Sequence, residues 1–271
     1  VISMTATPIP RSLALTLYGE LDISVIISRP NNRQHISTSI VSPNSLNTLF
    51  ATVDKLIEQG RQVFVVCPLI KSSDTMQGVS SADEIFKDLS TKYFKHRTLS
   101  LLHGKMKANE KDKIMSDFIK NKTQILVSTT VIEVGVDVPN ASVMLIYSAE
   151  RFGLAQLHQL RGRIGRGEHQ GYCYAILSDS KPPSKRLRAF SQTNDGFKLS
   201  ELDLELRGPG AIYGTLQHGQ LDLRMAKLTD TKLIAAAQLS AKHFIKQNES
   251  LIQYKHLART IHKSQFITTL N

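Results

Sequence analysis

The chain has 271 residues, of which 41% are hydrophobic, so it can build the core of one large domain or of one domain with appendages. It carries 34 lysines and arginines against 23 aspartates and glutamates, and the net charge of +11 favours a polyanionic partner. No stretch approaches the roughly 18 apolar residues of a membrane span, and no signal peptide opens the chain, which excludes the membrane and secreted classes and predicts a cytoplasmic protein.

Short apolar runs alternate with amphipathic segments along the first two thirds of the sequence. Strands are predicted at residues 23–28, 35–41, 62–68, 98–102, 124–128, 143–147 and 171–177. Helices are predicted at residues 44–59, 82–93 and 107–120, and the polar residues 71–81 predict a surface loop. Strands separated by helices form crossover connections. The predicted fold class is therefore α/β, with a parallel sheet wrapped by helices.

The last third of the chain is predicted to be helical. Residues 181–192 and 196–206 form two helices that a short connection folds into an antiparallel hairpin. A glycine-rich loop follows, and two more helices span residues 231–246 and about 252–262. From the residues alone, the simplest interpretation of the hairpin and its loop is a stabilising cap on the sheet.

Local charge and one short motif point to phosphate binding. Residues 151–192 carry eight lysines and arginines against two acidic residues, whereas residues 1–150 carry sixteen against fourteen. Within the basic region stands the string Gln-Leu-Arg-Gly-Arg-Ile-Gly-Arg-Gly, residues 159–167. Arginine offers a planar fork of donors and stays charged, so three arginines at the end of a helix are typical of a phosphate clamp. The alternative is a solvated basic helix end.

A second motif follows the predicted strand at residues 124–128 and reads Ser-Thr-Thr-Val-Ile-Glu-Val-Gly-Val-Asp-Val-Pro. Ligands of open parallel sheets bind where the strands end, so we expect this segment and the arginines at the carboxyl edge of the sheet. Thr129 and Thr130 can donate to phosphates, and Gly135 permits a close backbone approach. Asp137 offers a carboxylate to a ribose hydroxyl, although the alternative is a simple turn former.

These two motifs resemble those of superfamily 2 helicases and translocases. Gln159, Gly162, Arg163, Gly165 and Arg166 match Q-x-x-G-R-x-G-R, and residues 130–139 match T-x-x-x-x-G-x-D-x-P. The resemblance implies the second RecA-like lobe of a P-loop NTPase-like motor, with Arg163 and Arg166 as catalytic residues and Arg166 as the arginine finger. It implies nucleotide contacts by Gly135, Asp137, Gln159, Arg163 and Arg166. It also implies nucleic-acid or coupling roles for Thr129, Thr130 and Glu133.

Two weaker matches extend this resemblance. Residues 4–11, Met-Thr-Ala-Thr-Pro-Ile-Pro-Arg, are similar to the motif that closes the first lobe of such helicases, which implies coupling roles for Thr5 and Thr7. His103 and Gly104 match a loop that contacts nucleic acid in related proteins. Residues 1–20 are accordingly expected to be the end of a first lobe.

Two motifs that ATP hydrolysis by such motors requires are missing from the sequence. It contains no G-x-x-x-x-G-K-[ST] phosphate loop and no paired acidic box for Mg²⁺. We therefore expect ATP and Mg²⁺ to be held mainly by a first lobe upstream, and this chain alone not to hydrolyse ATP. Cys67 and Cys173 stand in apolar runs, so we expect buried free thiols and no metal site.

The C-terminal third resembles the translocation motif shared by RecG-type helicases and the transcription-repair coupling factor. The matching stretches are residues 194–197, 201–210 and 214–219, and they imply coupling roles for Arg186, Arg207 and Gln217. Leu216 stands where that family has an arginine. The Leu-Arg-Gly-Pro-Gly string and the short ending favour the RecG type. The implied domains are residues 1–20, the second lobe at 21–178, the translocation hairpin and loop at 179–222, and a helical tail at 223–271.

Taken together, the resemblance implies the C-terminal part of a monomeric ATP-dependent DNA helicase that remodels branched or duplex DNA, such as stalled replication forks and Holliday junctions, in recombination and repair. An N-terminal wedge domain and the first helicase lobe would be its partners within the same protein, and no membrane is involved. Two alternatives remain. One is a translocase like the transcription-repair coupling factor, and the other is a non-catalytic α/β module that binds nucleic acid.

Overall fold

The computed structural model describes residues 35–68, 75–129, 138–207, 231–247 and 250–268, together with Ser24 and Ile26. The chain divides into two compact units, with a boundary between Leu199 and Ser200 inside helix α7, Gly196–Arg207. The first unit holds the sheet, and the second holds the helices near the C-terminus. The four-part division expected from the sequence stays a prediction.

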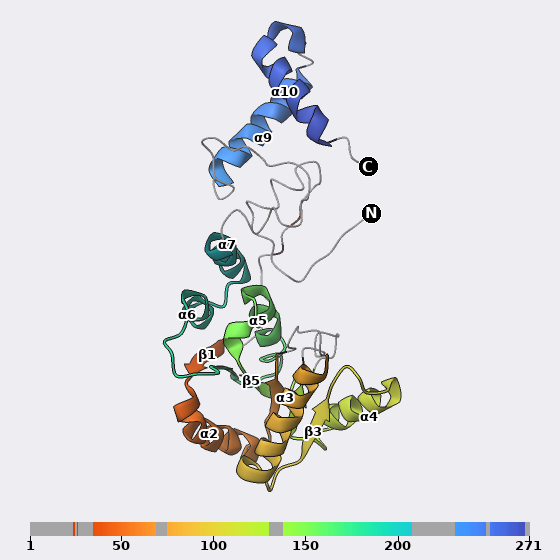
Figure 1. The fold of residues 1–271 in the computed structure, drawn as a ribbon, viewed down its shortest axis with the longest axis vertical. Coiled ribbons are helices and arrows are strands. Elements are labelled where there is room, and N and C mark those ends of the chain that lie inside the picture. The colour runs from red at the N-terminus through yellow and green to blue at the C-terminus, as the bar shows by residue number, and fades with distance from the viewer. Residues whose placement is uncertain are drawn as a thin grey trace. The chain divides into compact units, whose positions relative to one another are not determined.

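Among the described residues, six strands form one sheet in which every neighbouring pair is parallel. The order across the sheet is β1-β6-β5-β2-β4-β3, and Figure 1 labels β1, β5 and β3. The expected α/β class with a parallel sheet is confirmed, while the strand expected at residues 23–28 falls mostly outside the described residues. The strands are β1 Ile36–Val41, β2 Gln62–Val66, β3 Leu99–Leu102, β4 Ile125–Ser128, β5 Ala141–Ile146 and β6 Gly171–Ile176.

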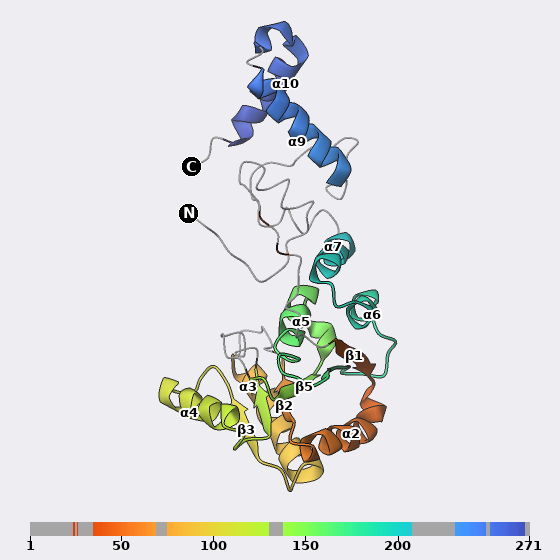
Figure 2. The ribbon, with the colours of Figure 1, turned by 180° about the vertical axis from the view of Figure 1, so that it is seen from behind.

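Helices connect these strands and flank the sheet, as Figure 1 and the reverse view in Figure 2 show. α2 packs on β2, α3 and α4 pack on β3, and α6 packs on β1. Because neighbouring strands are parallel, each connecting segment returns the chain from the carboxyl edge of the sheet to the amino edge. The helices are α2 Leu46–Glu58, α3 Thr75–Asp88, α4 Ala108–Ile119, α5 Leu154–Arg161 and α6 Lys185–Gln192.

The core lies around the two central strands, β2 and β5, which are buried along their whole length. α2 contributes one apolar face, with Leu49, Phe50, Val53 and Ile57 at helical spacing and all buried. Both thiols are free and buried, as expected, and burial raises the pKa of Cys67 and of Cys173 to about 12. They are therefore packing residues and not thiolate nucleophiles at neutral pH.

Two predicted boundaries are wrong for identifiable reasons. A loop is predicted at residues 71–81, but α3 already begins at Thr75. Its first turns are mostly polar and therefore do not indicate a helix. The helix extends toward the N-terminus from the apolar residues that pack on the core. The helix predicted from residue 181 begins only at Lys185. Two prolines precede it, and the Ser184 hydroxyl caps the helix by accepting a hydrogen bond from the Leu187 backbone N–H at 3.3 Å.

The second unit contains α9 Thr231–Lys246, as expected, and α10 Lys255–Thr268, which confirms a second helix but starts and ends later than the expected 252–262. The Phe244 and Tyr254 rings meet edge to face at 5.2 Å between centroids. No described helix combines the length and the apolar character that crossing a membrane requires. Within the described residues, no group of three or more histidine, cysteine or acidic side chains is arranged to hold a metal ion.

Candidate functional site at the two edges of the sheet

We call residues 162–170 the arginine loop, and this loop lies at the amino edge of the sheet. α5 follows β5 and returns the chain to the start of β6 at Gly171. Gly165 has a φ of +69°, which favours glycine, and it lies next to Gly171. A Cβ on Gly171 would stand 3.4 Å from the Gly165 Cα. Gly167 lies against the backbone of Pro139, just ahead of β5. The expected position at the carboxyl edge is therefore wrong for the arginines, because α5 carries them across the sheet.

Arg161, the first arginine of the motif, is not part of a surface clamp. Its side chain is only 2% exposed, and it belongs to the largest fully buried side chains of the described residues. Nη1 donates to the Phe190 carbonyl oxygen at 2.8 Å, and the guanidinium carbon stands 4.4 Å from the centre of the Phe190 ring. A buried cation of this kind joins elements of the fold instead of meeting a ligand.

Arg163 and Arg166 lie in the loop itself and are half-buried. Arg166 Nε donates to the Gly162 carbonyl oxygen at 3.1 Å, and the Arg163 backbone N–H donates to the Leu160 carbonyl oxygen at 2.9 Å. Both arginines follow the C-terminus of α5, where the helix dipole favours positive charge. Gln159, in the last turn of α5, is also half-buried. The structure thus brings the three motif residues expected at the nucleotide to one edge of the sheet.

The carboxyl edge carries a different set of polar groups. Thr129 directly follows β4 and His103 directly follows β3, and the Thr129 N–H donates to the carbonyl oxygen of Leu102 at 3.4 Å. Thr129 is fully buried, yet neither its hydroxyl nor His103 Nδ1 has a hydrogen-bond partner among the described residues. Buried polar atoms are nearly always paired, so these two atoms at adjacent strand ends lack, among the described residues, a partner that such atoms normally have.

Arg186, expected to be a coupling residue, lies in the first turn of α6. Its Nη2 donates to the backbone carbonyl oxygen of Glu150 at 2.9 Å. The Glu150 carboxylate in turn accepts from the Ser178 N–H at 3.4 Å, just beyond the carboxyl end of β6. Arg186 therefore ties the start of α6 to the segment that leads from β5 into α5.

A second polar cluster stands at the amino edge, beside β1. Asn194, in the connection between α6 and α7, donates to His35 Nε2 at 2.8 Å and to the Ile36 carbonyl oxygen at 3.0 Å. Gln170, the last residue of the arginine loop, donates through Nε2 to the carbonyl oxygen of His35. The loop and the end of α6 thus meet at the same strand end.

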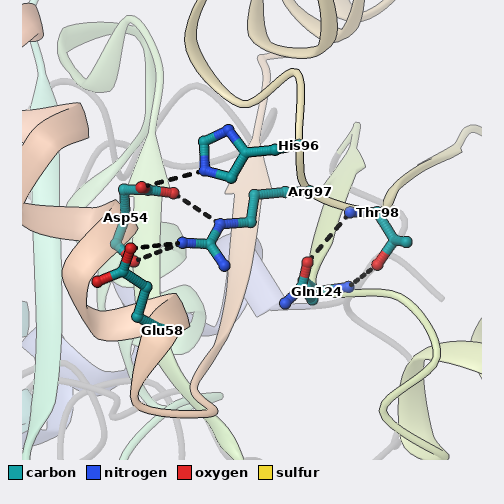
Figure 3. A network of polar contacts seen from close by, with 6 residues as sticks. All are labelled: Asp54, Glu58, His96, Arg97, Thr98 and Gln124. Carbon is teal, nitrogen blue, oxygen red and sulfur yellow. Dashed lines mark hydrogen bonds and ion pairs between the residues drawn. The ribbon is translucent and has the colours of Figure 1, made fainter.

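An ion-pair network fastens α2 to the segment ahead of β3 (Figure 3). Arg97 Nε donates to Asp54 Oδ1 at 2.7 Å, and Arg97 Nη2 stands 3.3 Å from Glu58 Oε1. His96 Nε2 stands 3.3 Å from Asp54 Oδ2. The hydrogen bond from Arg97, assisted by the charge of Arg97 and by His96, holds the pKa of Asp54 below its ordinary value. We assign this network a structural role.

Several residues singled out from the sequence lie outside the described part of the chain, namely Thr5, Thr7, Thr130, Glu133, Gly135, Asp137 and Gln217, as does the side chain of Arg207. Sequence reasoning also missed the contacts of His35 and Gln170, which carry no motif signal, and the contact of Asn194 with β1, although Asn194 lies in a stretch that matches the translocation motif. The burial of Arg161 could have been predicted from its spacing in the sequence. It stands seven residues after Leu154 and four after Leu157, on the buried face of α5.

Two protein families match this chain. Residues 48–168 match the helicase conserved C-terminal domain, which includes both edges of the sheet and most of the arginine loop. Residues 193–262 match a family described as "ATP-dependent DNA helicase RecG, domain 3, C-terminal". That second match begins at the α6–α7 connection.

Individual relatives agree with the family matches. The chain is 48% identical over 248 residues to the ATP-dependent DNA helicase RecG of Bacillus subtilis, covering 90% of this chain and 36% of that protein. It is 46% identical over 237 residues to RecG of Thermotoga maritima, covering 87% of this chain and 30% of that protein. A solved structure of RecG bound to a three-way DNA junction superposes with a TM-score of 0.66 at 43% identity, covering 86% of this chain and 30% of that one. The chain thus spans about a third of the length of these relatives.

Proposed function

Because this chain belongs to the RecG helicase family, we propose that it supplies the second motor lobe and the translocation module of an ATP-dependent DNA helicase. The whole protein would remodel branched DNA such as stalled forks and Holliday junctions in recombination and repair. One observation carries the proposal: the helicase C-terminal domain and the RecG-specific region match adjoining parts of one chain. That second match favours the RecG type over the transcription-repair coupling factor.

The two edges of the sheet would have different functions, one in nucleotide binding and one in DNA binding. The amino edge, with Gln159, Arg163 and Arg166, would face the nucleotide. Val138 and Pro139 lie at the same edge and directly follow Asp137 in the sequence, which supports nucleotide contacts by Asp137 and Gly135 as well. ATP and Mg²⁺ would be bound mainly by a first lobe. This chain would close the site from the opposite side.

In this arrangement the arginines act when the lobes close. Arg166, assisted by Arg163, would place its guanidinium against the charge that develops on the γ-phosphate, an effect worth about three to five powers of ten in rate. The Arg166 side chain is already oriented by its hydrogen bond to Gly162. Such orientation lowers the entropy lost when the charged group engages its target.

The carboxyl edge would contact the DNA backbone. The Thr129 hydroxyl and His103 Nδ1, which have no hydrogen-bond partner among the described residues, support this assignment, because phosphate oxygens accept hydrogen bonds from such groups. Gly104, Thr130, Glu133, Thr5 and Thr7 would complete this surface and link it to the nucleotide. Arg186, Arg207 and Gln217 would convert lobe closure into a step along the duplex. We further expect a cytoplasmic, monomeric protein.

The test compares the full-length protein with its Arg166→Ala variant in an ATPase assay and a fork-unwinding assay. We expect Arg166→Ala to abolish DNA-stimulated ATPase and to leave DNA binding nearly unchanged. Arg151→Ala, which removes an exposed arginine outside the loop, serves as the matched control and should keep wild-type turnover. Wild-type turnover by Arg166→Ala would contradict the role given to the arginine. A wild-type protein without DNA-stimulated ATPase would favour the non-catalytic binding module.

A second variant tests the translocation module. Gln217→Ala should keep the ATPase activity and lose fork unwinding, because it removes a coupling residue and no nucleotide contact. Equal loss of both activities would contradict this role. Capture of RNA polymerase by the full-length protein would instead favour a function like that of the transcription-repair coupling factor.

A further inference from the structure

The arginine loop is tied at its first end to α6 through Arg161. Arg161 Nη1 donates to the Phe190 carbonyl oxygen at 2.8 Å, and the guanidinium lies over the Phe190 ring. The same Nη1 stands 3.3 Å from the Thr38 hydroxyl, and Nη2 stands 3.3 Å from His158 Nδ1. One buried side chain therefore joins α5, α6 and β1.

The loop is tied at its other end to the same helix. Gln170 donates to the carbonyl oxygen of His35, and the His35 ring accepts a hydrogen bond from Asn194 at 2.8 Å. Asn194 stands two residues after the end of α6. Both ends of the arginine loop therefore reach α6 or the connection that follows it.

α6 is also fastened at its start. Arg186 in its first turn donates to the Glu150 carbonyl oxygen, four residues ahead of α5, while Phe190 in its last turn receives Arg161 from the end of α5. α6 is thus fastened at its start to the segment ahead of α5 and at its last turn to the end of α5. Separating the two helices would leave a buried guanidinium without its acceptors, which is costlier than a small rigid shift.

We propose that Arg161 is a positioning residue that transmits movement of the arginine loop to α6, and through α6 to the translocation module. The inference rests on the function proposed above, in which nucleotide draws the loop toward a first lobe. Arg161 does not touch the nucleotide in this scheme, because its donors are directed at Phe190, Thr38 and His158 inside the fold. Its role is to couple ATP hydrolysis mechanically to movement along the DNA.

The experiment uses the full-length protein and measures base pairs unwound per ATP hydrolysed. Arg161→Met keeps the apolar stem and removes the donors and the charge. We expect DNA-stimulated ATPase to stay within about threefold of wild type and base pairs per ATP to fall about tenfold. Arg161→Lys, which keeps the charge but not the planar fork, should lie between the two.

Variants of the residues that Arg161 contacts distinguish loss of the link to α6 from general destabilisation of the fold. Phe190→Leu removes the ring that covers the guanidinium and should lower base pairs per ATP, with an effect that is not additive with Arg161→Met. Thr38→Val removes the contact with β1 only and should leave the ratio unchanged. If Arg161→Met does not fold, Arg161→Lys and Phe190→Leu carry the same test.

Hydrogen exchange gives a readout that does not depend on turnover. In wild type, a non-hydrolysable ATP analogue should slow amide exchange in both the arginine loop and α6, whereas in Arg161→Met only the loop should respond. A wild-type ratio of base pairs to ATP in Arg161→Met, or α6 protection equal to that of wild type, would overturn the link. Loss of ATPase to the level of Arg166→Ala would make Arg161 a nucleotide ligand instead. Absence of any nucleotide response in wild type would count against the proposed function itself. The link can then still be tested without nucleotide. If the amides of α6 exchange no faster in Arg161→Met than in wild type, the link is overturned.

Discussion

Gly167 and Pro139 are in contact at the amino edge of the sheet, so closely that a Cβ on Gly167 would stand 2.5 Å from the Pro139 carbonyl oxygen. Gly167 ends the arginine motif, and Pro139 ends the motif that follows β4. The contact therefore joins two motifs that are almost thirty residues apart in the sequence. Only glycine permits it, because any side chain at residue 167 would meet the rigid backbone of Pro139.

We predict that Gly167→Ala displaces the arginine loop and lowers the DNA-stimulated ATPase of the full-length protein. A misplacement of about 1 Å costs up to about 100-fold in rate. Steady-state ATPase assays measure the effect. Gly60→Ala is the matched control, because Gly60 has a φ of +85° but open space around it, so the substitution should lower stability without lowering the turnover of the folded protein. Wild-type turnover by Gly167→Ala would show that the contact does not position the arginines.

Thr129→Val tests the carboxyl edge as a DNA surface. Valine has the shape of threonine and removes a buried hydroxyl that has no partner among the described residues, so stability should stay the same or rise slightly. DNA affinity should fall about five- to tenfold if that hydroxyl donates to a phosphate. Fluorescence anisotropy with a labelled fork measures the affinity.

Ser142→Ala provides the control for that substitution. Ser142 also has a buried hydroxyl without a partner in the described part of the chain, but it is the second residue of β5 and lies toward the amino edge. Its removal should leave DNA affinity unchanged. An equal loss of affinity in both variants would rule out a specific contact at Thr129.

The Asp54–Arg97 pair predicts a pH dependence of stability. Because the native pKa of Asp54 is lowered, chiefly by the Arg97 hydrogen bond, its contribution is present above the unfolded pKa of about 4 and is lost as the pH falls through the native value. Arg97→Met should reduce the free energy of unfolding at pH 7 by about 1–2 kcal/mol. The difference between wild type and variant should shrink toward pH 2. Urea unfolding at several pH values measures it, and a difference that grows on acidification would refute the assignment.

Gln62 is a fully buried amide whose loss should destabilise the lobe. Its Nε2 donates to the carbonyl oxygens of Phe118 at 2.6 Å and Thr123 at 2.8 Å, and its Oε1 accepts from Asn140 at 3.3 Å. Gln62→Glu keeps the shape but turns a carboxylate oxygen toward two carbonyl oxygens, at a cost of about 3–5 kcal/mol at pH 7. Burial should raise the pKa of the new carboxyl, so the variant should regain stability as the pH falls and the protonated group donates again. Equal unfolding midpoints of variant and wild type at pH 7 would contradict this.

Fold class and motif identity followed from the sequence alone, because both depend on local patterns. The continuous apolar run before Pro68 indicates a buried parallel strand, and the spacing of Gln159, Gly162, Arg163 and Arg166 indicates a phosphate-binding motif wherever it lies. The first turns of α3 escaped prediction because their polar residues carry no periodicity. Their helical state follows from the packing of the apolar residues after them.

Tertiary structure alone decided which edge each motif occupies and which residues the buried arginine contacts. α5 carries the arginine loop to the edge opposite Thr129, and three arginines that look equivalent in the sequence divide into one core residue and two half-buried residues of the loop. The contacts of Arg161 with Phe190 and of Gln170 with His35 join residues that are 29 and 135 positions apart. No local pattern specifies such pairs, because they form only when crossover connections bring distant strands and helices to one place.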